Sequence, residues 1–408
     1  MRFLSPRTLS AIGVCNSAIA SAFDLPAQAV YVDLLSYSVL GANGSFRESS
    51  FDNATFFNPT LTAPPFFQVF HEGFLDILGP SSSIREIASN ASFAFAHEAP
   101  IYFPETDEMF FASNDGGSLG MSDLYHNNVY GKISLSAAED ALEANPDGGV
   151  VNVPVTELAL PEEIQMTNGG TGPYKGSLLL ITSGRGTRAP SIALVNPREP
   201  HNVTVLLDNF FGRQFNSLND IKVHPSSGKF FFTDVTYGYL FAFRPAPLMP
   251  NQVYRFDPDT GNVRVVADGF VRCNGIAFTG DGRTAYVSDT GASGGNLLGV
   301  NQTLPTTIYA FNIDENTQAF KNRRVFAYVD AGVPDGIQVD AMGNVYTGCG
   351  DGVQVFNEDG IILGKFFLGT TSANMAFAGD GRLLILADTK IILAHIAAKG
   401  VSLGGPSQ

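Results

Sequence analysis

The chain of 408 residues contains no tryptophan and only three cysteines, of which Cys15 lies close to the N-terminus. The other two, Cys273 and Cys349, are too few for the disulfide framework of a small secreted scaffold. The sequence also has no C-x-x-C pair and no cysteine–histidine cluster with zinc spacing, which argues against a structural zinc site. We expect Cys273 and Cys349 to be small buried residues; a disulfide between them is the alternative in an exported protein.

Basic residues and long apolar runs are scarce as well. The chain carries 24 lysine and arginine residues against 39 aspartate and glutamate residues, a formal net charge of −15. Because nucleic-acid phosphates bind to basic surfaces, this balance argues against a nucleic-acid partner. Beyond the N-terminal segment, no apolar run is long and charge-free enough to cross a bilayer, so we expect no membrane span.

The N-terminus has the features of a signal peptide. Arg2 and Arg7 precede a weakly apolar stretch at 9–20, and alanines at 18, 20 and 22 provide small-residue cleavage sites. We predict that residues 1–22 are a signal peptide and that the protein is secreted or retained in the endomembrane lumen; a disordered cytosolic N-terminus is the alternative. Five N-x-S/T sequons agree with export and predict glycosylation at Asn43, Asn53, Asn90, Asn202 and Asn301.

Four segments of the chain repeat one pattern, an apolar strand, a glycine-containing turn and a second apolar strand. Helical periodicity is nearly absent between them, and the Asp281-Gly282 and Asp380-Gly381 pairs are typical of hairpin turns. A strand-built repeat of a few tens of residues is typical of four-stranded propeller blades. The four segments cover residues 218–234, 273–289, 334–348 and 372–388.

We therefore predict an all-β fold, a six-bladed β-propeller with four-stranded blades. A strand at 29–40, within the N-terminal segment 23–92, would close the ring by pairing with the last blade. Residues 93–408 would form the propeller, so that 23–408 is a single domain. The blades are expected to begin near residues 95, 166, 219, 274, 335 and 373.

One position of the repeat, just before its first strand, carries polar residues. It holds Asn219, Asn274 and Asp335 in three copies and Ala373 in the fourth. Asparagine and aspartate are also common turn residues, which is the alternative for each one alone. The innermost strands of a propeller line its central channel, however, so these three side chains would meet on one axis. Glu98, at the same point of the first blade, would join them.

Glu98, Asn219, Asn274 and Asp335 would together form a ring of oxygen atoms with two formal negative charges. Such a set suits a hard divalent cation, because calcium takes six to eight oxygen ligands and tolerates irregular geometry. Softer metals would need cysteine or histidine at this position. The sequence therefore predicts a Ca²⁺ site, with Zn²⁺, Mg²⁺ or Mn²⁺ as alternatives.

The motifs around this ring resemble the gluconolactonase family, which includes senescence marker protein and luciferin-regenerating enzyme and is similar to the fungal secreted lactonohydrolases. The resemblance covers roughly residues 93–395 and rests on HEAP, LNDIKVHPSSGKFFFTDVTYG, NGIAFTGDGRTAYVSDT and PDGIQVDAMGNVYTG. It implies a six-bladed propeller with one divalent ion in its channel and hydrolysis of sugar or other lactones. The family's metal ligands would correspond to Glu98, Asn274 and Asp335, and its Asn-Asp pair to Asn219 and Asp220.

Two positions depart from the family pattern. The usual EGP motif is Glu98-Ala99-Pro100 here, and the arginine that animal members carry before the Asn-Asp pair is replaced by Ser217. The second change casts doubt on a sugar-acid substrate.

The ring suggests a mechanism for a metal-dependent lactonase acting on a small lactone. A bound cation would polarise the lactone carbonyl, and a water molecule would attack it. We expect Asp335 to orient this water with support from Asp220, and regard His97 and His126 as alternative bases. Asn168, Tyr237 and His97 are the expected substrate contacts.

Two other functions fit the same sequence. Long loops at 114–128 and 236–250 would suit a bulkier natural-product substrate, which the same scaffold could hydrolyse, cyclise or rearrange. A binding propeller that uses calcium only for stability is the second alternative, but a set of carboxylates with an open coordination position argues for catalysis.

Overall fold

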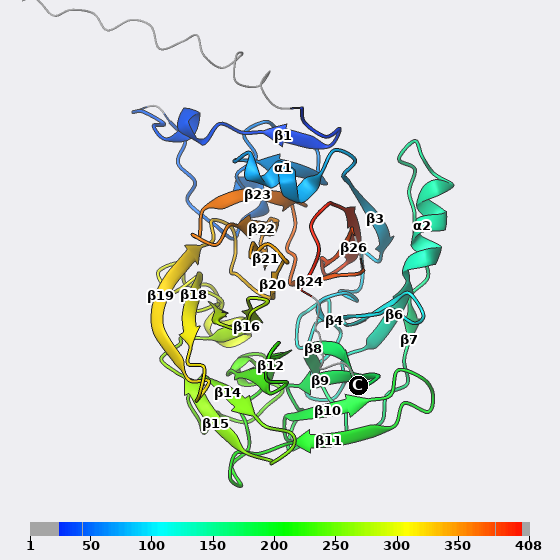
Figure 1. Ribbon diagram of the computed structural model, residues 1–408, viewed down its shortest axis with the longest axis vertical. Helices are drawn as coiled ribbons and strands as arrows, with labels where there is room; N and C mark the ends of the chain where they lie inside the picture. Colours follow the sequence, from blue (N-terminus) through cyan, green and yellow to red (C-terminus); the bar gives the residue numbers. More distant parts are fainter. Residues whose placement is uncertain (1–23, 43, 380, 402–408) are drawn as a thin grey trace, which may run out of the picture.

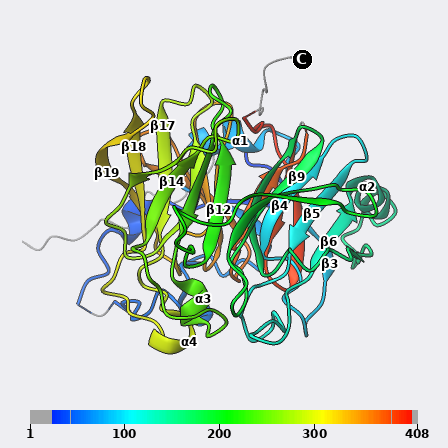
Figure 2. The same ribbon diagram turned by 90° about the horizontal axis from the view of Figure 1, so that it is seen from below.

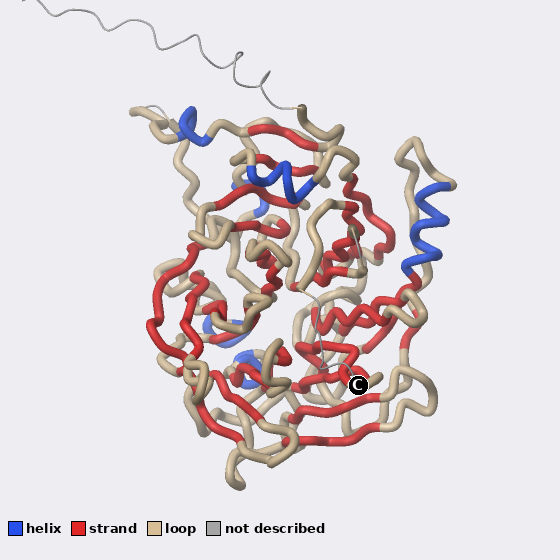
Figure 3. The backbone as a smooth tube through the Cα atoms, viewed as in Figure 1, coloured by secondary structure: helices blue, strands red, loops and turns tan. Residues whose placement is uncertain are grey.

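The computed structural model describes residues 24–42, 44–379 and 381–401. The expected signal peptide at 1–22 and the sequon residue Asn43 therefore lie outside the described residues. Strands dominate the described chain and the helices are short (Figure 3). The sheets surround a central axis (Figure 1), which confirms the predicted six-bladed β-propeller.

The first three blades are antiparallel meanders of four strands, each beginning at the channel and ending at the outer surface. Their strands are β4 (Glu98–Phe103), β5 (Glu108–Ala112), β6 (Tyr130–Ser134) and β7 (Thr156–Glu157); β8 (Thr167–Tyr174), β9 (Ser177–Thr182), β10 (Ser191–Val195) and β11 (Val203–Leu207); and β12 (Leu218–Val223), β13 (Phe230–Asp234), β14 (Gln252–Phe256) and β15 (Val263–Ala267).

The last three blades continue the same pattern, and the final one takes its fourth strand from the N-terminal part of the chain. Their strands are β16 (Cys273–Phe278), β17 (Thr284–Asp289), β18 (Thr307–Ile313) and β19 (Phe320–Tyr328); β20 (Ile337–Val339), β21 (Val345–Cys349), β22 (Gly352–Phe356) and β23 (Ile362–Phe367); and β24 (Asn374–Phe377), β25 (Arg382–Leu386), β26 (Lys390–His395) and β3 (Ser83–Ser89).

The ring closes differently from the prediction. The strand β3 pairs antiparallel with β26, whereas β1 (Ala29–Tyr31) pairs in parallel with β2 (Phe66–Val69), which extends the fifth blade through β23. The expectation that 29–40 pairs with the last blade is therefore wrong. The strand stops at Tyr31 because Asp33 accepts a hydrogen bond from the amide of Leu35 and caps the 3₁₀ turn η1 (Leu34–Tyr37).

Helices are confined to connections between strands. The helix α1 (Gly73–Leu78) precedes β3, and α2 (Leu135–Glu143) follows β6 on the outside of the ring. Two one-turn helices, α3 (Tyr237–Leu240) and α4 (Gly295–Leu298), lie at the same end of the propeller (Figure 2). In the part of the chain that the structure describes, no helix has the length and apolarity to cross a membrane.

The core lies between neighbouring blades, and this explains the many phenylalanines. Phe230, Phe231 and Phe232 follow one another in β13 and are all fully buried. Successive side chains of a strand point to opposite faces, so both faces of this strand must be covered. Phe232 stacks on Tyr254 of the adjacent strand with ring centroids 5.2 Å apart, while Phe231 contacts Phe278 of the next blade at 5.1 Å.

The two cysteines behave as small core residues. Cys273 and Cys349 are buried and free, so the alternative of a disulfide between them is wrong. Burial raises the pKa of both thiols well above the usual value, which keeps them protonated and unreactive.

Candidate active site

A bulge at the start of the inner strands turns the polar side chains toward the channel. The pairing of inner and second strand shifts register between Leu218 and Ile221 and between Cys273 and Ile276, which brackets Asn219 and Asn274. The same shift occurs in the first two blades, at Glu98 and Thr167. A β-bulge bends its strand and changes the direction of a side chain. The side chains at these positions can therefore point toward the channel instead of the space between blades.

The expected site residues gather around one cavity of about 280 Å³ at this end of the channel. Its lining includes all four expected cation ligands and all three expected substrate contacts. These are Glu98, Asn219, Asn274 and Asp335 on the one hand, and His97, Asn168 and Tyr237 on the other.

Several oxygen atoms around this cavity are buried without a hydrogen-bond partner. They are Oδ1 of Asn168, Oδ1 of Asn219 and Oδ1 of Asp335. Leaving a buried acceptor unpaired costs about 1–3 kcal/mol, so three in one place need an external partner. A divalent cation would be a suitable partner, because amide and carboxylate oxygens are the ligands that Ca²⁺ prefers. The residues present therefore fit the cation that the sequence predicts.

The two carboxylates of the ring repel each other. Ligand atoms of His97, Glu98 and Asp335 lie within 4.8 Å of one another. Burial and then the Asp335 charge raise the pKa of Glu98 well above its usual value. Burial likewise raises the pKa of Asp335 to about 7, although His97 opposes the change. A cation between these groups would favour their ionised forms.

His97 belongs to a second pair of groups beside the ring. Its Nδ1 lies 2.6 Å from Oδ1 of Asp388, which follows the second strand of the last blade. Burial alone would lower the pKa of His97, but the charge and hydrogen bond of Asp388 raise it to about 10. Because Asp388 holds Nδ1, the other nitrogen, Nε2, is the atom able to exchange a proton within the cavity.

Asp220 is not among the described residues that line the cavity. Its Oδ1 accepts a hydrogen bond from the amide of Ile221 (2.8 Å), and its Oδ2 accepts one from the amide of Ile276 on the next inner strand (2.9 Å). Both oxygens are thus engaged with backbone. The carboxylate links β12 to β16 and supports the neighbouring Asn219 and Asn274 from behind.

Asn374 plays the matching role at the last blade. Its Nδ2 donates to Oε2 of Glu98 (2.8 Å), so the blade that lacks a ring ligand at Ala373 still fixes the ligand of the first blade. Sequence alignment of the repeats places Asn374 one residue beyond the polar position, in register with Asp220.

A buried amide–carboxylate pair orients Asn168. Its Nδ2 donates to Oδ2 of Asp115 (3.1 Å), which also accepts from Oγ of Ser183 (2.9 Å). This contact fixes the amide with Oδ1 free for a cation or substrate. Burial raises the pKa of Asp115 to about 6.

Tyr237 lines the cavity, and its hydroxyl is engaged by neighbouring residues. The hydroxyl makes a short hydrogen bond with Oγ1 of Thr290 and lies 3.4 Å from the carbonyl oxygen of Ser293. His126, by contrast, has a side chain that is 70% exposed and pairs with Asp123, and it does not line this cavity.

The sequence analysis missed Asp388, although a signal was present. Three of the repeated sequence segments end in aspartate, at Asp234, Asp289 and Asp388. The first two accept hydrogen bonds from backbone amides of their own blade, at Asn216 and Arg272 for example, whereas Asp388 binds His97. Only the spatial neighbour separates the structural copies from the functional one.

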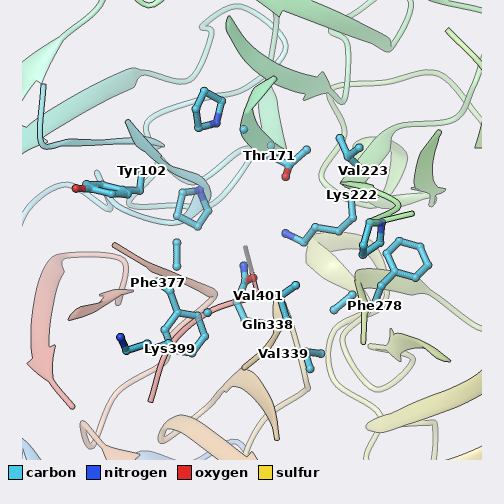
Figure 4. A pocket seen from close by; sticks show the side chains of 18 of the residues that line it. Tyr102, Thr171, Lys222, Val223, Phe278, Gln338, Val339, Phe377, Lys399 and Val401 are labelled. Carbon is cyan, nitrogen blue, oxygen red and sulfur yellow. The ribbon is translucent and has the colours of Figure 1, made fainter. Parts of the chain in front are cut away.

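The opposite end of the channel has a different chemistry (Figure 4). A cavity of about 470 Å³ lies between the far ends of the inner strands and residues 399–401. Among its described lining residues there is no aspartate, glutamate or histidine. Lys222 points into this cavity, with its Nζ 3.9 Å from Oδ1 of Asp220. The cation ligands are therefore confined to one end of the channel.

The fold and the oxygen-lined cavity together define a class, the six-bladed propellers with a polar site where the inner strands begin. Residues 98–387 match the family described as SMP-30/Gluconolactonase/LRE-like region, and the chain belongs to this family.

Relatives with assigned names share most of the chain. A lactonohydrolase of Aspergillus oryzae is 29% identical over 328 residues, which cover 75% of this chain and 68% of the relative. The gluconolactonase of Zymomonas mobilis is 26% identical over 361 residues, covering 86% and 87%. The solved structure of a gluconolactonase from Xanthomonas campestris gives a TM-score of 0.60 at 24% identity, covering 81% of this chain and 94% of that one. Both activities named here hydrolyse lactone esters, and the present chain is an enzyme of this hydrolase class.

Proposed function

We propose that the protein is a divalent-cation-dependent lactonase that hydrolyses a small lactone, with Ca²⁺ as the cation. One observation carries the cation requirement: Asn168, Asn219 and Asp335, from three different blades, turn unpartnered oxygens into one cavity that Glu98 also lines. Family membership supports lactone hydrolysis as the reaction.

Glu98, Asn219, Asn274 and Asp335 would hold the cation. When bound there, a divalent cation supplies polarisation of the lactone carbonyl and lowers the pKa of a water molecule. Backbone contacts of Asp220 and the hydrogen bond from Asn374 keep these ligands in position, so little reorganisation is needed at the moment of reaction.

The remaining residues handle water and protons. Asp335 orients the attacking water, whose oxygen forms a bond with the carbonyl carbon while the ring C–O bond breaks. The ring oxygen leaves as a hydroxyl group after it gains a proton, and the product is a hydroxy acid. Protonated His97 donates this proton from Nε2 and takes up the proton that the attacking water releases, while Asp388 occupies Nδ1 and holds the ring still.

A pH-stat assay of the purified protein tests the proposal. A panel of aldonolactones, alkyl lactones and larger lactones is measured with calcium, with chelator, and with calcium restored. We expect turnover to disappear with chelator and return with calcium, and Asp335→Asn to lower kcat at least about 100-fold. Asp359→Asn, at an exposed position between the outer strands of the same blade, is the matched control and should keep full activity.

Two results would contradict the proposal. Turnover that survives chelation would remove the cation from the mechanism. Calcium binding by calorimetry without hydrolysis of any lactone would instead favour the binding propeller.

We further propose that the protein is exported and glycosylated. The four sequon asparagines within the described chain, Asn53, Asn90, Asn202 and Asn301, are all exposed. A transferred glycan would therefore meet no buried surface at these positions.

A further inference from the structure

A segment outside the blades contributes to the candidate active site. Residues 44–60, called the N-terminal arm below, precede β2 and place Phe51 in the lining of the cavity that holds the cation ligands. Phe51 is half-buried, whereas Phe46 of the same arm is 72% exposed. The arm therefore directs one particular aromatic side chain toward the site.

Polar contacts hold the arm across the connection between β19 and β20. Arg47 pairs with Oδ2 of Asp330 (2.9 Å) and also donates to its carbonyl oxygen (2.8 Å). The carbonyl oxygen of Ser50 accepts from the amide of Gly332 (2.6 Å), and the amide of Ser50 donates to Oε1 of Gln302 (2.8 Å). The connection between β19 and β20, to which the arm is bound, also contains the expected cation ligand Asp335.

The anchor extends into a buried charge network. Nζ of Lys365 lies 2.6 Å from both Asp330 and Asp351, and the side chains of Lys365 and Asp351 are almost completely buried. Burial alone would raise the pKa of Asp330, but Lys365 and then Arg47 hold it below its usual value. Lys365, Asp351 and Asp330 thus form a fixed attachment point for Arg47, which holds the arm beside the cavity.

Phe51 is one of several apolar side chains that line the cavity from its loops. Phe241 and Val333 also line it, and the rings of Tyr237 and Phe241 lie 5.9 Å apart. The hydroxyl of Tyr237 is already bonded to Thr290, so this residue offers the substrate its ring. These side chains come from the arm, from the connection after β13 and from the connection before β20.

The loop that carries Tyr237 and Phe241 is closely packed against its neighbours. A side chain at Gly116 would meet Cβ of Phe241 at 2.8 Å, and one at Gly295 would meet Cβ of Leu240 at 2.9 Å. The loop that carries Tyr237 and Phe241 is therefore packed on both sides.

The amides and carboxylates of the ring lie where the inner strands begin. The connecting loops add Phe51, Tyr237, Phe241 and Val333 to the lining of the cavity, together with the polar residues Asn114, Asp115, Ser293, Thr371 and Ser372. Among the described residues that line it, none is lysine or arginine. A sugar lactone carries hydroxyl groups around its ring, and burying a hydroxyl against aromatic carbon without a partner is unfavourable. An alkyl or aryl group gains free energy in the same place, because its apolar surface is removed from water.

We propose that the enzyme prefers a lactone with an apolar alkyl or aryl substituent over a polyhydroxylated sugar lactone, and that Phe51 of the N-terminal arm determines this preference. The inference rests on the proposed lactonase function. The carbonyl end of the substrate would lie at the oxygen ring, and the substituent would lie between Phe51, Phe241 and Tyr237.

The test compares three δ-lactones that differ in their substituents: δ-valerolactone, pentyl-substituted δ-decalactone and D-glucono-δ-lactone. We expect the wild-type enzyme with calcium to give the highest kcat/KM on δ-decalactone. Phe51→Ala should lower this value about tenfold or more through KM and change that for δ-valerolactone less than about twofold. Phe46→Ala is the matched control and should change neither, while Phe51→Leu should retain part of the preference.

Equal losses on all three lactones, or a wild-type preference for the sugar lactone, would overturn the inference and leave the lactonase function standing. If no lactone is hydrolysed, the lactonase proposal fails. Binding of the hydroxy-acid products then tests separately whether Phe51 favours apolar groups. 5-Hydroxydecanoate should then raise the unfolding temperature of the wild type more than gluconate does, and Phe51→Ala should abolish the difference. Unfolding temperatures without ligand verify that each variant is folded.

Discussion

Asn219 is an expected cation ligand whose amide can be compared with that of a neighbouring structural asparagine. Its Oδ1 is buried and has no hydrogen-bond partner, which costs folding free energy. Asn216, three residues earlier in the same blade, is equally buried, but its amide donates to the carbonyl of Met249 and accepts from backbone amides. The two asparagines separate a ligand position from a structural one.

This contrast gives a prediction at the scale of single residues. Leucine has a similar shape, so Asn219→Leu should leave the free energy of unfolding in chelator unchanged or slightly higher. Calcium at about 100 times its Kd should stabilise the wild type by about 2.7 kcal/mol and the variant by much less. Asn216→Leu should instead lose about 1–3 kcal/mol in chelator and keep the full calcium effect. Chemical denaturation of the three proteins with and without calcium provides the measurement, and a calcium effect of equal size in Asn219→Leu would contradict the assignment.

At the scale of elements, the start of each inner strand governs the geometry of the site. Glycine follows the expected ligands Asn274 and Asp335, and a side chain at either glycine would run into the neighbouring blade. At Gly275 a Cβ would collide with the carbonyl oxygen of Asp335, and at Gly336 with the amide of Asn374. Adjacent blades therefore approach closely at the ring, which brings their ligands together.

Gly275→Ala should accordingly disturb the cation site more than the fold. The added methyl group would displace the backbone at Asp335, and we expect calcium affinity to fall at least about tenfold. Gly280→Ala in the same hairpin is the control, since a Cβ there meets only Val401 at an ordinary 3.6 Å. Calorimetric titration with calcium measures both variants; unchanged affinity in Gly275→Ala would show that the strands can separate without loss of the site.

At the scale of the whole molecule, the repeat was predictable and its completion was not. Short hairpins with glycine turns mark four of the blades and the positions of Asn219, Asn274 and Asp335, because each depends on neighbouring residues. The closing strand β3 and the contact of Arg47 with Asp330 join residues about 300 positions apart. No local pattern marks such partners, so the ring closure and the place of Phe51 became visible only in three dimensions.

The exposed sequons lead to a prediction for the molecule as it leaves the cell. Asn53, Asn90, Asn202 and Asn301 are spread over the surface, and none lines the candidate cavity. Protein secreted from a eukaryotic host should therefore lose mass on treatment with an amidase that removes N-glycans, without loss of activity. A variant with glutamine at all five sequon asparagines, Asn43 included, should match the treated protein in mass apart from the small difference between glutamine and aspartate side chains. Secreted protein whose mass is unaffected by the treatment would contradict glycosylation.

The pairing of β26 with β3 also has a consequence for folding during synthesis. Ser89 leaves the ribosome about 300 residues before its partner Lys390. At about 5–20 residues per second, β3 waits for roughly 15 to 60 seconds while the other five blades are completed. During that interval its edge is unpaired and able to associate with other nascent chains. Slower translation or loss of the last blade should therefore increase aggregation far more than a defect in the cation site would.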